Sequence, residues 1–157
     1  MTKVSCRKLA IFFLTLFSLL NISDCWSDSS MKIWNLSNPN SFFVGREGKI
    51  NQISSFFTKG GHILAITGGP GFGKTQIAKK YAQRHQKEYQ LIWWIDAQQD
   101  IPSQFEKLAL SLNSILPEKE KIEPSTLSKD ALVDRVKDTL RVKNIHYLLI
   151  FDNAETY

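Results

Sequence analysis

The stretch "HILAITGGPGFGKTQIAKKYAQRH", residues 62–85, decides the fold because three kinds of sequence follow one another within it. Residues 62–67 form an apolar, β-branched run, which is typical of a parallel strand buried on both faces. A cluster of glycines comes next, followed by a basic stretch with one apolar helical face. That face consists of Ile77, Ala78, Tyr81 and Ala82. We therefore predict a strand, a glycine loop and a helix, in this order.

The glycine loop fits the pattern G-x-x-x-x-G-K-[ST] at residues 68–75. Glycines permit backbone conformations that a Cβ would forbid, so successive N–H groups can point at a phosphate, beside the positive end of the helix that follows. We expect Lys74 to reach the β- and γ-phosphates and the Thr75 hydroxyl to ligate Mg²⁺. The alternative is an ordinary glycine-rich turn, but the flanking strand and helix argue against it. The predicted phosphate-loop residues are Gly68, Gly69, Pro70, Gly71, Phe72, Gly73, Lys74, Thr75 and Gln76.

A nucleotide site also needs a carboxylate at the end of a second strand, to support the metal. Residues 147–151 are continuously apolar, and Asp152 follows them directly. The separation from Lys74 is 152 − 74 = 78 residues, which leaves room for a helix, a strand and another helix. Taken alone, this run fits any buried strand that ends in an aspartate. Together with the glycine loop, it predicts that Asp152 is the Walker B residue and holds Mg²⁺ through water.

The residues between these two motifs alternate between strand and helix patterns. Leu91–Asp96 reads as a buried strand, and its adjacent residues Trp93 and Trp94 point to opposite faces, so both faces must be covered. Two helices are predicted beyond it, the second capped by Ser128. Their apolar faces are Phe105, Leu108, Ala109 and Leu112 in the first, and Leu132, Val136 and Leu140 in the second. The alternation predicts an α/β fold with a parallel sheet and flanking helices.

With "FFVGREGKINQISSFF" (residues 42–57), the glycine loop, "LIWWIDAQ" and "LLIFDNAE" in the same order, the chain resembles NB-ARC domains, which are STAND-type P-loop NTPases. By itself "VGRE" is a turn followed by a helix start. The resemblance implies that Val44, Gly45 and Arg46 lie against an adenine, and that ATP or ADP with Mg²⁺ is the ligand. Guanine is disfavoured because the chain contains no N-K-x-D sequence.

Two departures from the family pattern qualify these expectations. Asn153 stands where hydrolysing relatives carry a second acid, and an amide cannot accept a proton, so hydrolysis is expected to be slow or absent. The given chain ends at Tyr157, whereas the family implies a sheet of order 5-1-4-3-2. We therefore expect an incomplete sheet without strands 4 and 5. Strand 4 would lie between residues 62–67 and 147–152, whose free edges would pair directly or seek another chain.

Residues 1–27 have the pattern of a secretory signal peptide or a membrane anchor, with basic residues before the apolar run Leu9–Leu20. As a helix this run spans roughly 18 Å, short of a hydrocarbon core of about 30 Å, so a spanning helix is the weaker interpretation. The leader predicts export or membrane tethering; an unused start before Met31 would leave the protein cytoplasmic. An uncleaved anchor and a decayed gene fused to a leader are further alternatives. Residues 28–40 are the predicted linker and 41–157 the partial nucleotide-binding domain.

Composition restricts the other function classes. Both cysteines lie within the first 25 residues, so the rest of the chain contains no disulfide and no thiolate metal site. The net charge of +5 is scattered and lacks interleaved aromatic residues, which disfavours nucleic acid as a partner. We expect an adenine-nucleotide switch whose full-length relatives bind a protein partner or self-assemble. The alternatives are a non-functional or purely interacting fragment, and an active ATPase of another P-loop clan.

Overall fold

The computed structural model describes residues 32–154, so the predicted leader lies outside the described residues. Within them, no helix is both long enough and apolar enough to cross a bilayer. The elements are, in chain order, β1 (Ile33–Trp34), α1 (Glu47–Thr58), α2 (Lys74–Arg84), β2 (Leu91–Asp96), α3 (Ile101–Leu112), the 3-10 turns η1 (Glu118–Glu120) and η2 (Pro124–Thr126), α4 (Lys129–Val142) and β3 (Tyr147–Asp152).

The three strands form one parallel sheet in the order β1-β2-β3. The register of β2 and β3 runs from Leu91 opposite Tyr147 to Asp96 opposite Asp152, so the two strands end at the same level. This confirms the predicted α/β class with a parallel sheet. The short strand β1 was not predicted, since it lies within the expected linker 28–40 and pairs with β2 through only two residues.

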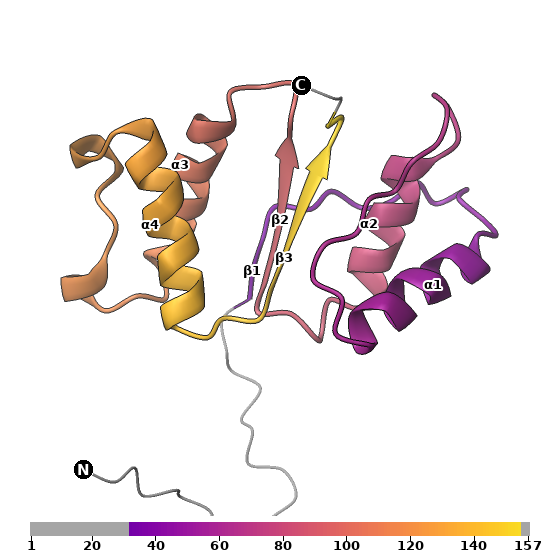
Figure 1. Ribbon diagram of the computed structural model, residues 1–157, viewed down its shortest axis with the longest axis horizontal. Helices are drawn as coiled ribbons and strands as arrows, with labels where there is room; N and C mark the ends of the chain where they lie inside the picture. Colours follow the sequence, from indigo (N-terminus) through magenta and orange to yellow (C-terminus); the bar gives the residue numbers. More distant parts are fainter. Residues whose placement is uncertain (1–31, 155–157) are drawn as a thin grey trace, which may run out of the picture. The chain divides into compact units, whose positions relative to one another are not determined.

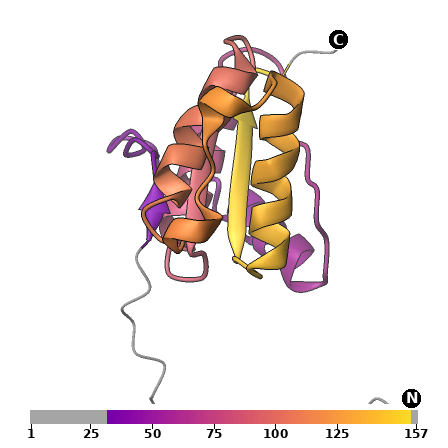
Figure 2. The same ribbon diagram turned by 90° about the vertical axis from the view of Figure 1, so that its left-hand side faces the viewer.

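The helices cover the two faces of the sheet in pairs, α3 and α4 on one side and α1 and α2 on the other (Figure 1). Figure 2 shows α3 and α4 in front of β3 when the view is turned by 90°. Trp93 and Ile95 belong to the core cluster beneath α3 and α4, whereas Ile92 belongs to the cluster beneath α1 and α2. Both faces of β2 are thus covered, as the adjacent tryptophans predicted.

The apolar faces of α3 and α4 lie where their spacing placed them. All seven predicted core residues of these two helices are buried. Asp100 caps α3 by accepting a hydrogen bond from the Ser103 N–H at 3.0 Å, and Ser128 caps α4 by accepting from the Ala131 N–H at 3.3 Å. Each cap satisfies an N–H group that the helix itself leaves without a partner. The capping role predicted for Ser128 is therefore confirmed.

The prediction of a buried strand at residues 62–67 is wrong. The segment is not assigned to the sheet, and Ile63 is 89% exposed. None of its backbone N–H and C=O groups forms a hydrogen bond within residues 32–154, and it does not pair directly with β3 either. The physical reason is the absence of a neighbour, because no strand among the described residues lies on either side of it. Only Leu64 and Ile66 pack against the cluster beneath α1 and α2.

The Asn113 side chain fixes the chain between α3 and α4, which allows a first prediction. The Asn113 amide donates to the Ile122 carbonyl and accepts from the Ile122 N–H, both at 2.8 Å, and Ile122 is buried. Asn113→Ala leaves both backbone groups without these partners, so we expect the free energy of unfolding to fall by about 1–3 kcal/mol. Urea denaturation measures this loss. Asn51→Ala, on the exposed face of α1, is the control and should change stability by less than about 0.5 kcal/mol; an equal loss in both variants contradicts the role of the Asn113 bridge.

Candidate functional site

The glycine segment and the carboxyl ends of β2 and β3 lie at the same end of the sheet, at the top of the view in Figure 1. α2 begins at Lys74 directly after this segment. One interaction joins the two regions: the Thr75 hydroxyl donates to Asp152, with 3.0 Å from Oγ1 to Oδ1 and 3.1 Å to Oδ2. Two residues that the sequence predicted to share a metal, 77 positions apart, are therefore in contact.

The glycine loop depends on conformations that favour glycine. Gly71 and Gly73 have φ angles of 76° and 78°, and Gly73 is the residue from which α2 starts. The Lys74 ammonium turns back across the loop and donates to the carbonyl oxygens of Gly68 at 2.8 Å and of Gly69 at 3.0 Å. The cation therefore lies at the mouth of the loop, beside the helix N-terminus, where the field is positive.

The "VGR" segment forms the predicted turn before α1. Gly45 and Arg46 have positive φ angles of 79° and 64°, and Arg46 is the residue at the start of the helix. A salt bridge of 2.6 Å from Glu47 to Arg84 ties this helix start to α2. Val44 is 84% exposed and does not line the cavity described next. The turn thus brings Arg46, but not Val44, to the candidate site.

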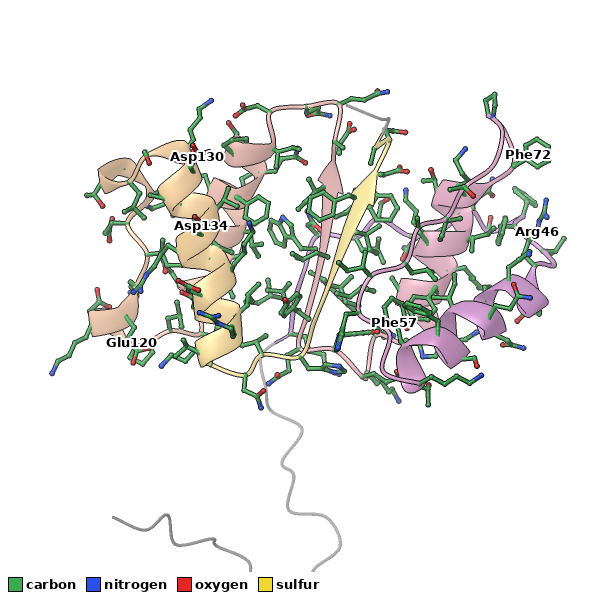
Figure 3. The ribbon with its side chains drawn as sticks, viewed as in Figure 1. Arg46, Phe57, Phe72, Glu120, Asp130 and Asp134 are labelled. Carbon is green, nitrogen blue, oxygen red and sulfur yellow. The ribbon has the colours of Figure 1, made fainter. Side chains whose placement is uncertain are left out.

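A cavity of about 400 Å³ lies between α1, the segment 62–67 and the glycine loop. Of the predicted site residues it contains Arg46, Gly68, Phe72 and Lys74; Figure 3 places Arg46 and Phe72 at the same side of the molecule, from the start of α1 and from the loop. Its lining combines apolar side chains with three basic ones. Its lining residues are Arg46, Lys49, Gln52, Ile53, Leu64, Ala65, Ile66, Thr67, Gly68, Phe72, Lys74 and Ile77.

Not every predicted residue faces this cavity. Thr75 and Asp152 lie outside its lining, in contact with each other. The Gln76 side chain has a different partner, since its Oε1 accepts a hydrogen bond from the Asn40 N–H at 2.8 Å and so holds the segment before α1 against α2. The other predicted loop residues that do not line it are Gly69, Pro70, Gly71 and Gly73, together with Gly45 of the turn.

Sequence reasoning missed several polar residues of this region, and three of them bear on the proposals below. Lys49 and Gln52 line the cavity, and their spacing of three and six residues after Arg46, which places all three on one helix face, could have indicated it. The third is Asp96, at the end of β2 beside Asp152. A hydrogen bond from Asn153, with further ones from Gln98 and Gln99, holds the pKa of Asp96 below its usual range, so this carboxyl is ionised at neutral pH.

Comparison with known proteins identifies the family. The family model described as the NB-ARC domain matches residues 46–156, which is well over half of the chain. No curated protein and no solved structure matched this chain. The matched segment begins at Arg46 and contains the glycine loop, both long strands and all four α-helices. The chain therefore belongs to the NB-ARC domain family, a group of STAND-type P-loop NTPases.

Proposed function

We propose that this chain binds an adenine nucleotide, ADP or ATP, together with Mg²⁺, and that it hydrolyses ATP slowly or not at all. NB-ARC domains are nucleotide-binding signalling modules, so membership of the family supports a nucleotide ligand. The observation that carries the proposal is the contact between Thr75 and Asp152, beside the Lys74 ammonium and the basic cavity. In the proposed complex Lys74 exchanges the loop carbonyls for phosphate oxygens.

The donor atoms present fit a magnesium ion. Mg²⁺ prefers oxygen ligands and usually binds to one or two protein groups, phosphate oxygens and water. A hydroxyl has one donor and two acceptor lone pairs. The Thr75 hydroxyl donates its hydrogen bond to Asp152, so the lone pairs of its oxygen remain available to a cation. The Asp152 carboxylate can hold the same cation through a water molecule. When bound, Mg²⁺ would offset the phosphate charge.

The cavity beside the loop fits the rest of a nucleotide. Ile53, Leu64 and Ile66 give it an apolar floor on which a base can lie, while Arg46 and Lys49 supply positive charge. Gly68 and Lys74 belong both to this cavity and to the loop, so one ligand can occupy both regions. We assign the phosphates to residues 68–75 and the base to the cavity beside Arg46.

The signalling role follows from the family rather than from this site. The family implies nucleotide binding and possible oligomerisation, so we propose that a protein partner or further copies of the protein respond to the nucleotide. Asn153 supports slow turnover, because its amide cannot accept a proton next to Asp152. A slow switch dwells in one nucleotide state. A fast motor does not.

One observation favours the second candidate function, a fragment that holds no nucleotide by itself. The glycine loop follows residues 62–67, which lack backbone hydrogen bonds within the described part of the chain. A loop that starts from an unpaired segment loses conformational entropy on binding, and that cost opposes the ligand. The two candidates differ in a single measurable quantity, the stability that nucleotide adds.

Thermal unfolding with nucleotide tests the proposal. A ligand at a hundred times its Kd adds about 2.7 kcal/mol of stability, so we expect saturating MgADP to raise Tm by several degrees. Thr75→Val, which keeps the side-chain shape and removes the hydroxyl, should weaken MgADP binding by about tenfold and leave metal-free ADP binding unchanged, since a hydrogen bond or ligand of this kind contributes on the order of 1.5 kcal/mol.

Thr58→Val is the matched control for this experiment. Thr58 is also β-branched, and its hydroxyl donates only to the Ser54 carbonyl in the last turn of α1. It should leave MgADP affinity unchanged. If neither MgADP nor MgATP raises Tm of the unmodified chain, the nucleotide-binding proposal is wrong. The result then supports the second candidate, a fragment that holds no nucleotide by itself.

A further inference from the structure

Asp96 lies beside the predicted metal residue Asp152, on the same face of the sheet. The two residues are paired in register at the carboxyl ends of β2 and β3, and adjacent strands lie about 4.8 Å apart. Side chains at alternate positions of a strand share a face. Ile92 packs in the cluster beneath α1 and α2, and Lys79 of α2 lies 5.3 Å over the Trp94 ring. Asp96 therefore faces α2, as Asp152 does through Thr75.

A set of amide groups holds Asp96 in place. Gln104 of α3 accepts from the Asp96 N–H at 2.9 Å and donates to the Asp96 carbonyl at 2.8 Å, which fixes the backbone. On the carboxylate, Oδ1 accepts from the Gln98 N–H and from the Asn153 amide, both at 3.2 Å, and Oδ2 accepts from the Gln99 amide at 2.7 Å. A carboxylate has about four acceptor positions, so one remains open.

Asn153 connects the Asp96 carboxylate with ATP hydrolysis. It occupies the position after Asp152, where an acid would orient the attacking water, but its amide donates to Asp96 instead. The hydrogen bond links the end of β3 to an ionised carboxylate one strand away. The acceptor that position 153 lacks is thus present on the neighbouring strand.

We propose that Asp96 orients the water that attacks the γ-phosphate, in place of an acid at position 153. This inference rests on the proposed binding of MgATP. In the reaction the water oxygen forms a bond to the γ-phosphorus, and the bond from that phosphorus to the β,γ-bridging oxygen breaks. ADP leaves with the electron pair of the broken bond. Both protons of the water end on the inorganic phosphate, while Asp96 accepts a hydrogen bond that aims the water oxygen.

Asp96→Asn in the full 157-residue chain tests this role. Asparagine keeps one acceptor oxygen for Gln98 and Asn153, but it replaces the other oxygen with an amide nitrogen that donates. We expect single-turnover release of phosphate from MgATP to fall by at least about tenfold, the lower end of what a positioned acid or base contributes. MgADP and MgATP affinity, measured by calorimetry, should stay within about twofold. A purely structural role of Asp96 would instead change the affinity and Tm as well.

Asp100→Asn is the matched control. Asp100 is a hydrogen-bonded aspartate of the β2–α3 loop, and asparagine caps a helix about as well as aspartate does. Its phosphate release should equal that of the unmodified chain. An Asp96→Asn variant that releases phosphate at the unmodified rate overturns the inference, as does an unmodified chain that binds MgATP and releases none. A chain that binds no nucleotide overturns the proposed function instead.

Discussion

Lys74→Ala should raise the Kd for MgADP by about 10- to 100-fold, since a hydrogen bond to a charged group contributes about 1.5–3 kcal/mol. In the structure the Lys74 ammonium reaches the carbonyls of Gly68 and Gly69 and lies at the mouth of the loop, where the proposed phosphates bind. Alanine removes the only side-chain cation that the described residues place across this loop. Isothermal titration calorimetry with MgADP measures the effect.

Lys80→Ala is the control for this variant. Lys80 belongs to the same helix, and its ammonium lies 3.4 Å from the Gln83 amide oxygen rather than near the loop. Both variants carry the same change in net charge, so a general loss of positive charge affects them equally. Lys80→Ala should bind MgADP as the unmodified chain does. Unchanged affinity in Lys74→Ala contradicts the assignment of the loop to phosphate.

The second large effect concerns stability, on which the site depends. Leu108 of α3 is fully buried in the cluster with Trp93, Ile95 and Leu140. Leu108→Ala removes buried apolar surface and leaves a cavity, at a cost of about 2–5 kcal/mol. Domains are typically stable by about 5–15 kcal/mol, so this change removes a large part of the total. We expect the urea midpoint to fall by about 1–2 M, as measured by circular dichroism.

Leu110→Ala provides the comparison within the same helix. Leu110 is 56% exposed, so its truncation changes little buried surface and should cost less than about 0.5 kcal/mol. A similar loss in the two variants would mean that α3 packs through a different face. MgADP affinity should be retained in both variants at temperatures where they are folded, because neither leucine lines the candidate site.

The local patterns of this chain predicted most of its elements correctly. Glycine spacing and the adjacent helix pattern predicted a helix directly after the loop, where α2 lies, and apolar periodicity identified the buried faces of α3 and α4. These features depend on residues a few positions apart, whose geometry within a helix is nearly constant. The sequence also predicted that Thr75 and Asp152 serve one metal ion, and the structure brings these two side chains into contact.

The failure at residues 62–67 has a different origin. An apolar, β-branched run indicates that a segment is suited to a strand. A strand forms only when a neighbouring strand pairs with its backbone N–H and C=O groups. Within residues 32–154 no strand pairs with this segment, while the two residues of β1 pair with β2 although no pattern marked them. The assignment of Gln76 to the nucleotide remains a prediction, and in the structure its amide already binds Asn40.

By itself the sequence determined the α/β class, the glycine loop, the family and the identity of the residues proposed to meet phosphate and magnesium. Only the tertiary structure decided that Asp96 stands in register beside Asp152, and that Lys49 and Gln52 share a cavity with Arg46. The physical reason is the separation along the sequence over which each effect acts. Periodicity and glycine content act within a few residues, whereas strand order and side-chain convergence depend on partners 50 or more positions away, such as Asp96 and Asn153 at a separation of 57.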